Sequence, residues 1–343
     1  MPRGIFRLKQ VYEEQLSGEW STKEDVWNTP SPFTKAHPFG YFGGGYGPKS
    51  TVDRIDYSSD TGTTPTKGPL SVAMYGVAAT GNADFGYFGG GASPTKSTVD
   101  RIDYSNDTAT ASVKGPLSLA REYLAATGNA DFGYFGGGGP GAKSTVDRID
   151  YSNDTATAAV KGPLSAARYL LAATGNASFG YFGGGNGPVS TVDRVDYSND
   201  TATAVAKGPL SAARRYIAAT SSRANAILPE NIVNYAAGTY GTPNTGYFGG
   251  GYTSTSVSTV DRIDYSNDTA TAATKGPLSV ATYQFGATGN GSFGYFAGGI
   301  PGISTVNRID YLNDTGTTPT KGPLSLARRG FGACSAGANA NPQ

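Results

Sequence analysis

Short runs of apolar, β-branched and aromatic residues alternate with clusters of glycine, asparagine and aspartate along most of this chain. One stretch reads G-Y-F-G-G-G, followed by a variable segment, then S-T-V-D-R-I-D-Y-S-N-D-T, and then K-G-P-L-S. Runs of this length, bounded by turn residues, are typical of β-strands. Charged runs of the kind that favour helices are nearly absent beyond residue 40. The pattern therefore predicts an all-β chain.

The same block occurs six times. Its tyrosines are Tyr41, Tyr87, Tyr134, Tyr181, Tyr247 and Tyr295, so successive blocks are 46 to 48 residues apart except for one interval of 66. A repeat of this length built from four short strands predicts one blade of a β-propeller. A single blade cannot bury both faces of its own sheet, so the blades must pack around a common axis. We expect residues 39–343 to form one six-bladed propeller.

Four strands are expected in the block that spans residues 120–165. They comprise residues 121–127, 132–135, 144–151 and 155–160. Gly128 and Asn129 form the first turn, because both residue types accept a positive φ easily. Residues 152–154 form a later turn, since asparagine and aspartate side chains can hydrogen-bond to the nearby backbone.

The two ends of the repeat region complement each other. The first G-Y-F-G-G-G, at Gly40, has no inner strand before it, and the last inner strand, residues 328–334, has no second strand after it. Joining the two gives six whole blades and removes exposed strand edges that favour aggregation. We therefore expect a C-terminal strand to complete the first blade.

The block resembles the Kelch repeat. The matching residues are Tyr134, Phe135, Gly136, Gly137, Tyr151 and Arg168. Arg121, Arg214 and Arg328 occupy the position of Arg168 in other blades, whereas Met74 and Thr282 replace it in two, and the family's tryptophan is missing throughout. The resemblance covers residues 39–336 and implies a Kelch-like propeller. It implies little about function, because propellers support many functions.

The D-R-I-D unit also recurs in every blade. Strand alternation places Arg54 and Asp56 on one face of the strand, and Asp53 on the other. We interpret the arginine as one half of an ion pair with carboxylates of the same or the next blade, since a catalytic site normally occurs once. S-S-D-T-G-T-T at residues 58–64 resembles the Asp-box of sialidases, in which that motif is a hairpin turn. A sialidase would also need unique arginines around one pocket, and no blade arginine clearly departs from the repeat pattern.

Composition and charge exclude several further classes. The formal net charge is +1, which predicts no attraction to nucleic acid. The sequence contains no run of about 18 apolar residues, so it predicts no membrane-spanning helix. His37 is the single histidine and Cys334 the single cysteine, and the G-G-G runs lack the lysine of a phosphate-binding loop. We expect no metal, no cofactor and no enzymatic activity.

The loops after the triple glycines differ among the copies, and all six should emerge on one rim. Two explanations fit these differences equally well. The loop tips pack against nothing and their sequences change freely, or the loops form a contact surface. If the rim is a contact surface, its candidate binding residues are Tyr46, Lys49, Lys96, Lys143, Tyr252 and Ile300.

Two segments belong to no blade. Residues 221–244 lengthen one inter-strand turn and contain too many apolar residues for a free linker, which favours a partner contact. Residues 1–38 precede the first blade and contain both tryptophans. We expect this leader to be an attachment arm that docks on another protein through Ile5, Phe6, Leu8, Tyr12, Trp20 and Trp27.

The leader, I-F-R-L-K-Q-V-Y-E-E-Q-L-S-G-E-W, followed by near-identical propeller repeats, resembles structural proteins of marine tailed phages. The resemblance implies a non-enzymatic virion protein that is anchored to other virion proteins by residues 1–38, and through 221–244 as a further contact. Its propeller would then be displayed for adsorption to a host surface glycan or protein, or would decorate the particle. A cellular Kelch-type module that binds protein or glycan is the alternative. A glycan-processing enzyme is a third class, which the lone histidine disfavours.

Overall fold

The computed structural model of the chain describes residues 39–222 and 244–335. The leader residues expected to dock on a partner (Ile5, Phe6, Leu8, Tyr12, Trp20 and Trp27) lie outside the described residues, as does most of the 221–244 insertion. Every structural statement below refers to the described residues.

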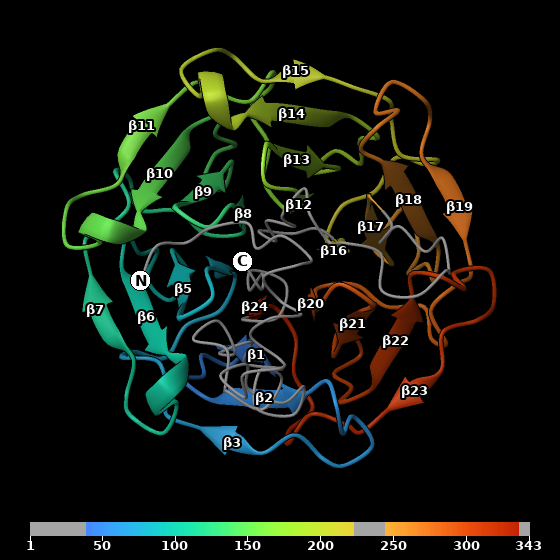
Figure 1. Cartoon of the computed structure of the whole chain (residues 1–343), viewed down its shortest axis with the longest axis horizontal. Helices are drawn as coiled ribbons and strands as arrows, with labels where there is room; N and C mark the ends of the chain where they lie inside the picture. Colours follow the sequence, from blue (N-terminus) through green and yellow to red (C-terminus); the bar gives the residue numbers. More distant parts are fainter. Residues whose placement is uncertain (1–38, 223–243, 336–343) are drawn as a thin grey trace, which may run out of the picture. The chain divides into compact units, whose positions relative to one another are not determined.

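Six four-stranded antiparallel sheets surround a central axis, with the inner strands next to the axis and the outer strands at the circumference (Figure 1). The first blade contains β24 (Gly332–Ser335), β1 (Phe39–Gly43), β2 (Val52–Asp56) and β3 (Thr66–Lys67). The next two contain β4 (Ala78–Gly81), β5 (Phe85–Gly89), β6 (Val99–Asp103) and β7 (Ser112–Lys114), then β8 (Ala125–Gly128), β9 (Phe132–Gly136), β10 (Val146–Asp150) and β11 (Ala159–Lys161).

The other three blades repeat this order. They contain β12 (Ala172–Gly175), β13 (Phe179–Gly183), β14 (Val192–Asp196) and β15 (Val205–Ala206), then β16 (Ala218–Ser221), β17 (Thr245–Gly249), β18 (Val260–Asp264) and β19 (Ala273–Lys275), and finally β20 (Gly286–Gly289), β21 (Phe293–Ala297), β22 (Val306–Asp310) and β23 (Thr320–Lys321). The all-β, six-bladed propeller predicted from the repeat period is thus confirmed.

The C-terminal strand completes the first blade, as the sequence predicted. Strand β24 pairs antiparallel with β1, and Gly40 lies opposite Ser335 while Gly43 lies opposite Gly332. The four strands of this blade therefore come from both ends of the propeller sequence. No other blade requires such a contribution, because each of the remaining five is built from consecutive strands.

All four strand boundaries in the block of residues 120–165 differ from the prediction. The first strand, predicted over 121–127, is β8, which begins only at Ala125 and includes Gly128, a residue predicted to lie in the turn; the second strand, β9, extends one residue further, to Gly136. The third strand, predicted over 144–151, is β10 and ends at Asp150, because the Asp150 carboxylate accepts a hydrogen bond from the Ser152 N–H and starts a 3-10 helix over Tyr151–Asn153. The outer strand, predicted over 155–160, is the shorter β11. Equivalent 3-10 helices occupy Tyr104–Asn106 and Tyr197–Asn199.

The hydrophobic core lies between neighbouring blades. One cluster joins Tyr41 and Val52 of the first blade to Phe88 and Ile102 of the second. In five blades a glycine follows the Tyr-Phe pair and permits this contact, because a Cβ atom added at Gly43 would lie 2.6 Å from the Phe88 ring; Ala297 occupies this position in the blade of β20–β23. The repeated G-Y-F-G sequence is therefore a requirement of blade-to-blade packing.

The D-R-I-D arginines form ion pairs with carboxylates of the next blade, one of the two arrangements expected from the sequence. Arg54 Nη1 lies 2.8 Å from Asp107, the aspartate of the S-N-D-T turn in the next blade. The same carboxylate accepts a hydrogen bond from the Tyr41 hydroxyl and lies 3.2 Å from Lys67 Nζ. Equivalent ion pairs link Arg101 to Asp154, Arg148 to Asp200, Arg194 to Asp268, Arg262 to Asp314 and, across the closure of the ring, Arg308 to Asp60.

The Asp-box-like turn therefore has a structural role, in agreement with the sequence interpretation. Burial alone would raise the pKa of Asp60, but hydrogen bonds from Tyr295 and Lys321 and the charge of Arg308 hold that pKa below its ordinary value. This carboxylate is ionised in the folded protein and contributes to closure of the ring.

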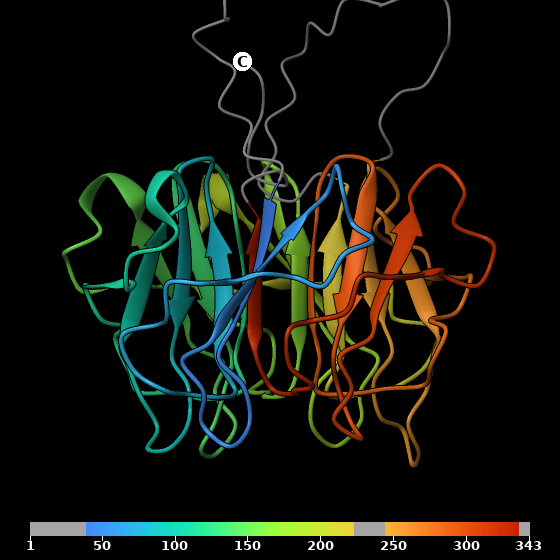
Figure 2. The same cartoon turned by 90° about the horizontal axis from the view of Figure 1, so that it is seen from below.

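The two ends of the propeller carry different parts of the chain (Figure 2). Phe39, Ser222, Asn244 and Ser335, which flank the undescribed segments, lie at the end where β1 begins and β24 ends. The six variable loops that follow the triple glycines lie at the other end. We call the first end the terminal face and the second the loop face.

Candidate functional site

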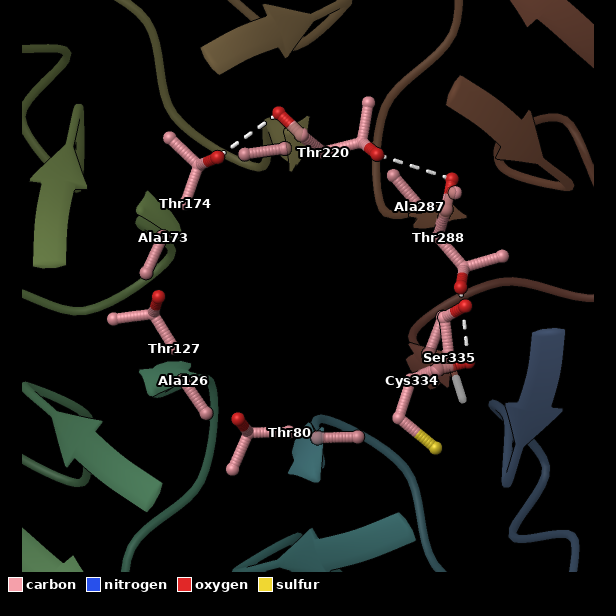
Figure 3. A pocket seen from close by; sticks show the side chains of 14 residues that line it. Thr80, Ala126, Thr127, Ala173, Thr174, Thr220, Ala287, Thr288, Cys334 and Ser335 are labelled. Carbon is pink, nitrogen blue, oxygen red and sulfur yellow. Dashed lines mark hydrogen bonds between the residues drawn. The ribbon is translucent and has the colours of Figure 1, made fainter. Parts of the chain in front are cut away.

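A ring of alanine and threonine residues surrounds the axis near the terminal face (Figure 3). It encloses a hollow of about 60 Å³. Its polar positions are Thr80, Thr127, Thr174, Thr220 and Thr288, and Cys334 occupies the sixth. Thr174 Oγ1 donates to the Thr220 carbonyl at 2.9 Å, and Thr220 Oγ1 donates to the Thr288 carbonyl at 3.1 Å.

This threonine ring is part of the scaffold. Its hydroxyls also bond to buried tyrosines, since Thr174 Oγ1 lies 2.9 Å from the Tyr265 hydroxyl and Thr288 Oγ1 lies 2.9 Å from the Tyr57 hydroxyl. Five of its six positions are the same residue, as expected for a structural feature. Burial raises the pKa of the Cys334 thiol to about 12, so the thiolate form of this residue is scarce at neutral pH.

The loop face is closed around the axis by a circle of backbone hydrogen bonds. One residue in each blade has a left-handed conformation with φ between 51° and 64°, namely Gly76, Tyr123, Leu170, Tyr216, Gln284 and Gly330. Each of their N–H groups donates to the carbonyl of the corresponding residue in the preceding blade, with N···O distances of 2.6 to 3.2 Å. The circle is complete, because Gly76 donates to Gly330.

Four side chains are held in this costly conformation. A left-handed φ costs about 1–2 kcal/mol for residues other than glycine, and such positions cluster at functional sites. The two glycines, Gly76 and Gly330, belong to adjacent blades, and a Cβ atom added at Gly76 would lie 3.2 Å from the Tyr123 ring. A Cβ atom added at Gly330 would meet no atom closer than 3.9 Å. A hollow of about 70 Å³ lies on the axis at this face.

Six tyrosines form a continuous row across the loop face, which we call the tyrosine row. Their order is Tyr46, Tyr75, Tyr123, Tyr216, Tyr283 and Tyr252, with neighbouring ring centroids 5.2, 6.0, 6.2, 5.6 and 5.1 Å apart. Tyr46 is 51% exposed, and the other five side chains are half-buried. Aromatic rings that are partly exposed and carry a hydroxyl group are common in binding surfaces, because they offer both apolar contact and hydrogen bonds.

Two arginines lie against this row. The Arg329 guanidinium is 4.1 Å from the centre of the Tyr46 ring. The Arg215 guanidinium is 5.2 Å from the Tyr252 ring and 5.6 Å from the Tyr216 ring. All three distances are within the range of cation–π contacts. The blade arginines that seemed from the sequence to follow the repeat pattern therefore include two that do not.

Glu122 is the single acidic residue in the six loops and in the segments that connect each K-G-P-L-S to the next inner strand. It precedes Tyr123, and its backbone pairs with that of Gly139. Burial raises the pKa of its carboxyl group. The loop face thus has little negative charge to offset its cations.

The structure places every candidate residue of the propeller on the loop face. Tyr46 and Tyr252 are the two ends of the tyrosine row, and Ile300 is next to it, since its N–H donates to the Tyr283 carbonyl at 2.9 Å. Lys49, Lys96 and Lys143 are the last residues of their loops, and the backbones of Lys49 and Lys143 pair with those of Met74 and Arg168. Whether these residues bind a ligand remains a prediction.

Sequence reasoning missed most of the tyrosine row and both unpaired arginines. These residues are Tyr75, Tyr123, Tyr216, Tyr283, Arg215 and Arg329. A signal for them exists, because the two positions that follow L-S-x-A-x read Y-G, E-Y, Y-L, R-Y, Y-Q and R-G in successive copies. The flanking sequence hardly changes, so this difference marks the same surface as the variable loops.

No protein-family model matches the chain, and no curated protein sequence is significantly similar to it. Within the described residues, no helix has the length and hydrophobicity needed to span a membrane. Residues 39–222 and 244–335 also contain no group of three or more histidine, cysteine or acidic side chains arranged to hold a metal ion.

Proposed function

We propose that this protein is a non-enzymatic virion component that displays its propeller on the particle and contacts a host surface glycan or protein through the loop face. The observation that carries the proposal is the distribution of differences among the copies. Six nearly identical blades differ in their outer strands and in some turns of the terminal face, but their differences at the loops and at the residues around the axis fall on one continuous surface. Free drift of loop tips would not also change the half-buried residues of the tyrosine row.

The proposal treats the protein as a binder rather than an enzyme. The charged clusters of the blades, such as Arg54 with Asp107 and Tyr41, recur around the ring with the same partners. A group that recurs in every blade is suited to holding blades together. The surface that differs among blades is rich in tyrosine and arginine, the residue types enriched in binding hot spots.

Anchoring through the leader fits the same arrangement. Phe39, the first described residue, lies on the terminal face, as do Ser222 and Asn244, which flank the insertion. Contacts with other virion proteins through residues 1–38, and through 221–244, would leave the loop face free for a host partner. The virion location itself rests on the resemblance of the leader and the repeats to phage structural proteins.

A cellular Kelch-type binding module is the second candidate. It is favoured by the buried arginines at the Kelch position, since Arg121, Arg168, Arg214 and Arg328 each bind an aspartate of their own blade.

Mass spectrometry of gradient-purified virus particles from the source of this sequence separates the two candidates. We expect the chain to sediment with the particles at a fixed ratio to the capsid protein. Recovery in host-cell fractions alone would contradict the virion proposal and favour the cellular module.

A further inference from the structure

All the unpaired cations in the described part of the chain lie on the loop face. Arg215 and Arg329 donate no hydrogen bond to a described residue from their guanidinium groups, and Lys49, Lys96 and Lys143 form no ion pair with a described residue. Every other described arginine and lysine is ion-paired with an aspartate.

Most acids of the described residues that form no ion pair lie at the opposite end, and the exceptions are Glu122 on the loop face and the buried Asp100. The third strand of each blade ends on the terminal face with an aspartate that is hydrogen-bonded to the local backbone and forms no ion pair with a described residue. These residues are Asp56, Asp103, Asp150, Asp196, Asp264 and Asp310, and Asp84 and Asp131 lie in turns at the same end. The described part of the chain therefore has a cationic face and an anionic face, and an anionic ligand is attracted to the first.

The two arginines are held in place before any ligand binds. Each guanidinium lies over a tyrosine ring, which limits its motion and leaves hydrogen-bond donors without a partner in the described structure. A guanidinium matches carboxylate and sulfate groups through parallel N–H···O bonds. A preformed arrangement of this kind lowers the entropic cost of binding.

We propose that the loop face binds an acidic polysaccharide, with Arg215 and Arg329 as ligands for its carboxylate or sulfate groups and the tyrosine row in contact with its sugar rings. This inference rests on the proposed function and names its ligand class. The free cations come from four blades, with Arg329 and Lys49 in the first and the others in the blades of β4, β8 and β16. A small anion could reach one or two of them, whereas a polymer with regularly spaced charges can reach several.

A single-stranded nucleic acid fits the tyrosine row less well. Bases bind proteins by stacking on free aromatic faces, but each tyrosine of the row packs against its neighbours at centroid distances of 5.1 to 6.2 Å. The phenol hydroxyls of the row form no hydrogen bond with a described residue, and sugar hydroxyls can bond to them.

The test measures binding of the full-length protein to immobilised alginate, dextran sulfate, neutral dextran and poly(dT) at two salt concentrations. We expect binding to alginate, dextran sulfate or both, with an affinity that falls as salt rises. The comparison of alginate with dextran sulfate distinguishes carboxylate from sulfate recognition. We expect R215Q/R329Q to weaken binding about tenfold or more, because two charge-assisted hydrogen-bonding groups are lost.

The matched control is N82D/N176D, which lowers the net charge by the same amount on the terminal face. Asn82 and Asn176 accept backbone hydrogen bonds through their side-chain oxygens, so aspartate preserves these turns. We expect the control to retain affinity within about twofold, and both variants to unfold at the temperature of the original protein.

Three results would overturn the inference. They are no binding to either acidic polysaccharide, equal loss in R215Q/R329Q and N82D/N176D, and binding to neutral dextran or poly(dT) as tight as to the acidic polysaccharides. None of them would affect the virion proposal, which depends on the presence of the chain in purified particles.

Discussion

The position that precedes each inner strand, occupied by Arg121 in the blade of β8–β11, carries one of three residue types around the ring. In four blades a buried arginine lies 2.6 to 3.1 Å from a buried aspartate of the third strand. In the blade of β20–β23 the pair is Thr282 and Asn307, so both charges are absent. In the blade of β4–β7 the arginine is replaced by Met74, but Asp100 remains, fully buried and without a cation.

This unpaired carboxylate gives a pH prediction. Burial raises the pKa of Asp100, although Ser71 donates two hydrogen bonds to it. The native state therefore holds this proton more tightly than the unfolded state, and the contribution of Asp100 to stability falls as pH rises above its ordinary pKa of 3.8. Asparagine cannot ionise, so we expect D100N to gain on the order of 1 kcal/mol relative to the original protein between pH 4 and pH 7.

The measurement is the difference in unfolding free energy between D100N and the original protein by urea denaturation at both pH values. The effects of the other carboxylates cancel in this difference. D84N, which changes an exposed aspartate of the same blade, is the control substitution. A gain for D100N that is equal at pH 4 and pH 7 would contradict the assignment.

Removal of one member of a buried pair should cost more than removal of both. Arg121 donates to the Asp147 carboxylate and to the carbonyls of Gly137 and Thr145. We expect R121T to lose about 3 kcal/mol of stability, because Asp147 stays buried without its cation. The double variant R121T/D147N copies the Thr282–Asn307 pair and should lose less. A double variant that is less stable than R121T would contradict this account, and denaturant unfolding of both proteins is the measurement.

At the residue scale the sequence predicted which positions matter better than it predicted their partners. Arg54 was recognised as one half of a structural ion pair, but its partner, Asp107, is 53 residues away in a turn of the next blade. Alternation along one strand gives the face on which a side chain lies. It does not give the offset between neighbouring blades, which depends on how the sheets pack.

At the scale of elements, the four-residue strand β24 joins the last part of the propeller sequence to the first blade. It pairs with β1, and the Arg328 guanidinium that precedes it donates to the Phe42 carbonyl at 2.9 Å. The Tyr57 hydroxyl of the first blade also donates to Ser335 Oγ at 2.8 Å.

Deletion of residues 328–343 should therefore cause insolubility or a large loss of thermal stability, because it exposes an edge of β1 and opens the ring. The matched control is deletion of residues 336–343, which keeps β24 and should leave the unfolding temperature nearly unchanged. Scanning calorimetry of both proteins is the measurement. Equal unfolding temperatures for the two truncated forms would rule out closure by β24.

The strand order and the closing strand could both be predicted from the sequence, since each depends on the repeat period and on which element is missing at each end. Strand ends were less predictable. The Asp150 side chain caps a 3-10 helix and ends β10 early. The sequence D-R-I-D-Y is equally compatible with a second aspartate that continues the strand. Whether that aspartate caps a helix depends on the conformation of the residues that follow it.

At the scale of the molecule, the leader and the insertion both join the propeller at the terminal face, and the tyrosine row lies at the opposite end. Removal of residues 1–38 should leave a folded propeller that no longer joins its assembly. The expected readouts are an unchanged thermal transition for the propeller and absence of the truncated chain from particles. W20A/W27A should weaken incorporation more mildly. Normal occupancy of the truncated chain would move attachment to the blades or to residues 221–244.

The loop face shows where sequence reasoning ends. The variable loops identified Tyr46 and Tyr252. The four residues that connect them come from different blades and meet through the geometry of the ring, namely Tyr75, Tyr123, Tyr216 and Tyr283. Their arrangement follows from the closed circle of backbone hydrogen bonds around the axis. That circle depends on six copies in register, and a pattern within one copy does not reveal it.

The central claim is that the propeller is displayed with its loop face outward and its terminal face toward the particle. Electron cryomicroscopy of purified particles that contain the chain tests this claim most directly, because the propeller axis and the 3-10 helices of the terminal face distinguish the two ends. We predict density for a six-bladed ring whose tyrosine row is solvent-exposed and whose Phe39 side faces the particle. A ring whose loop face is buried against the particle would contradict the account.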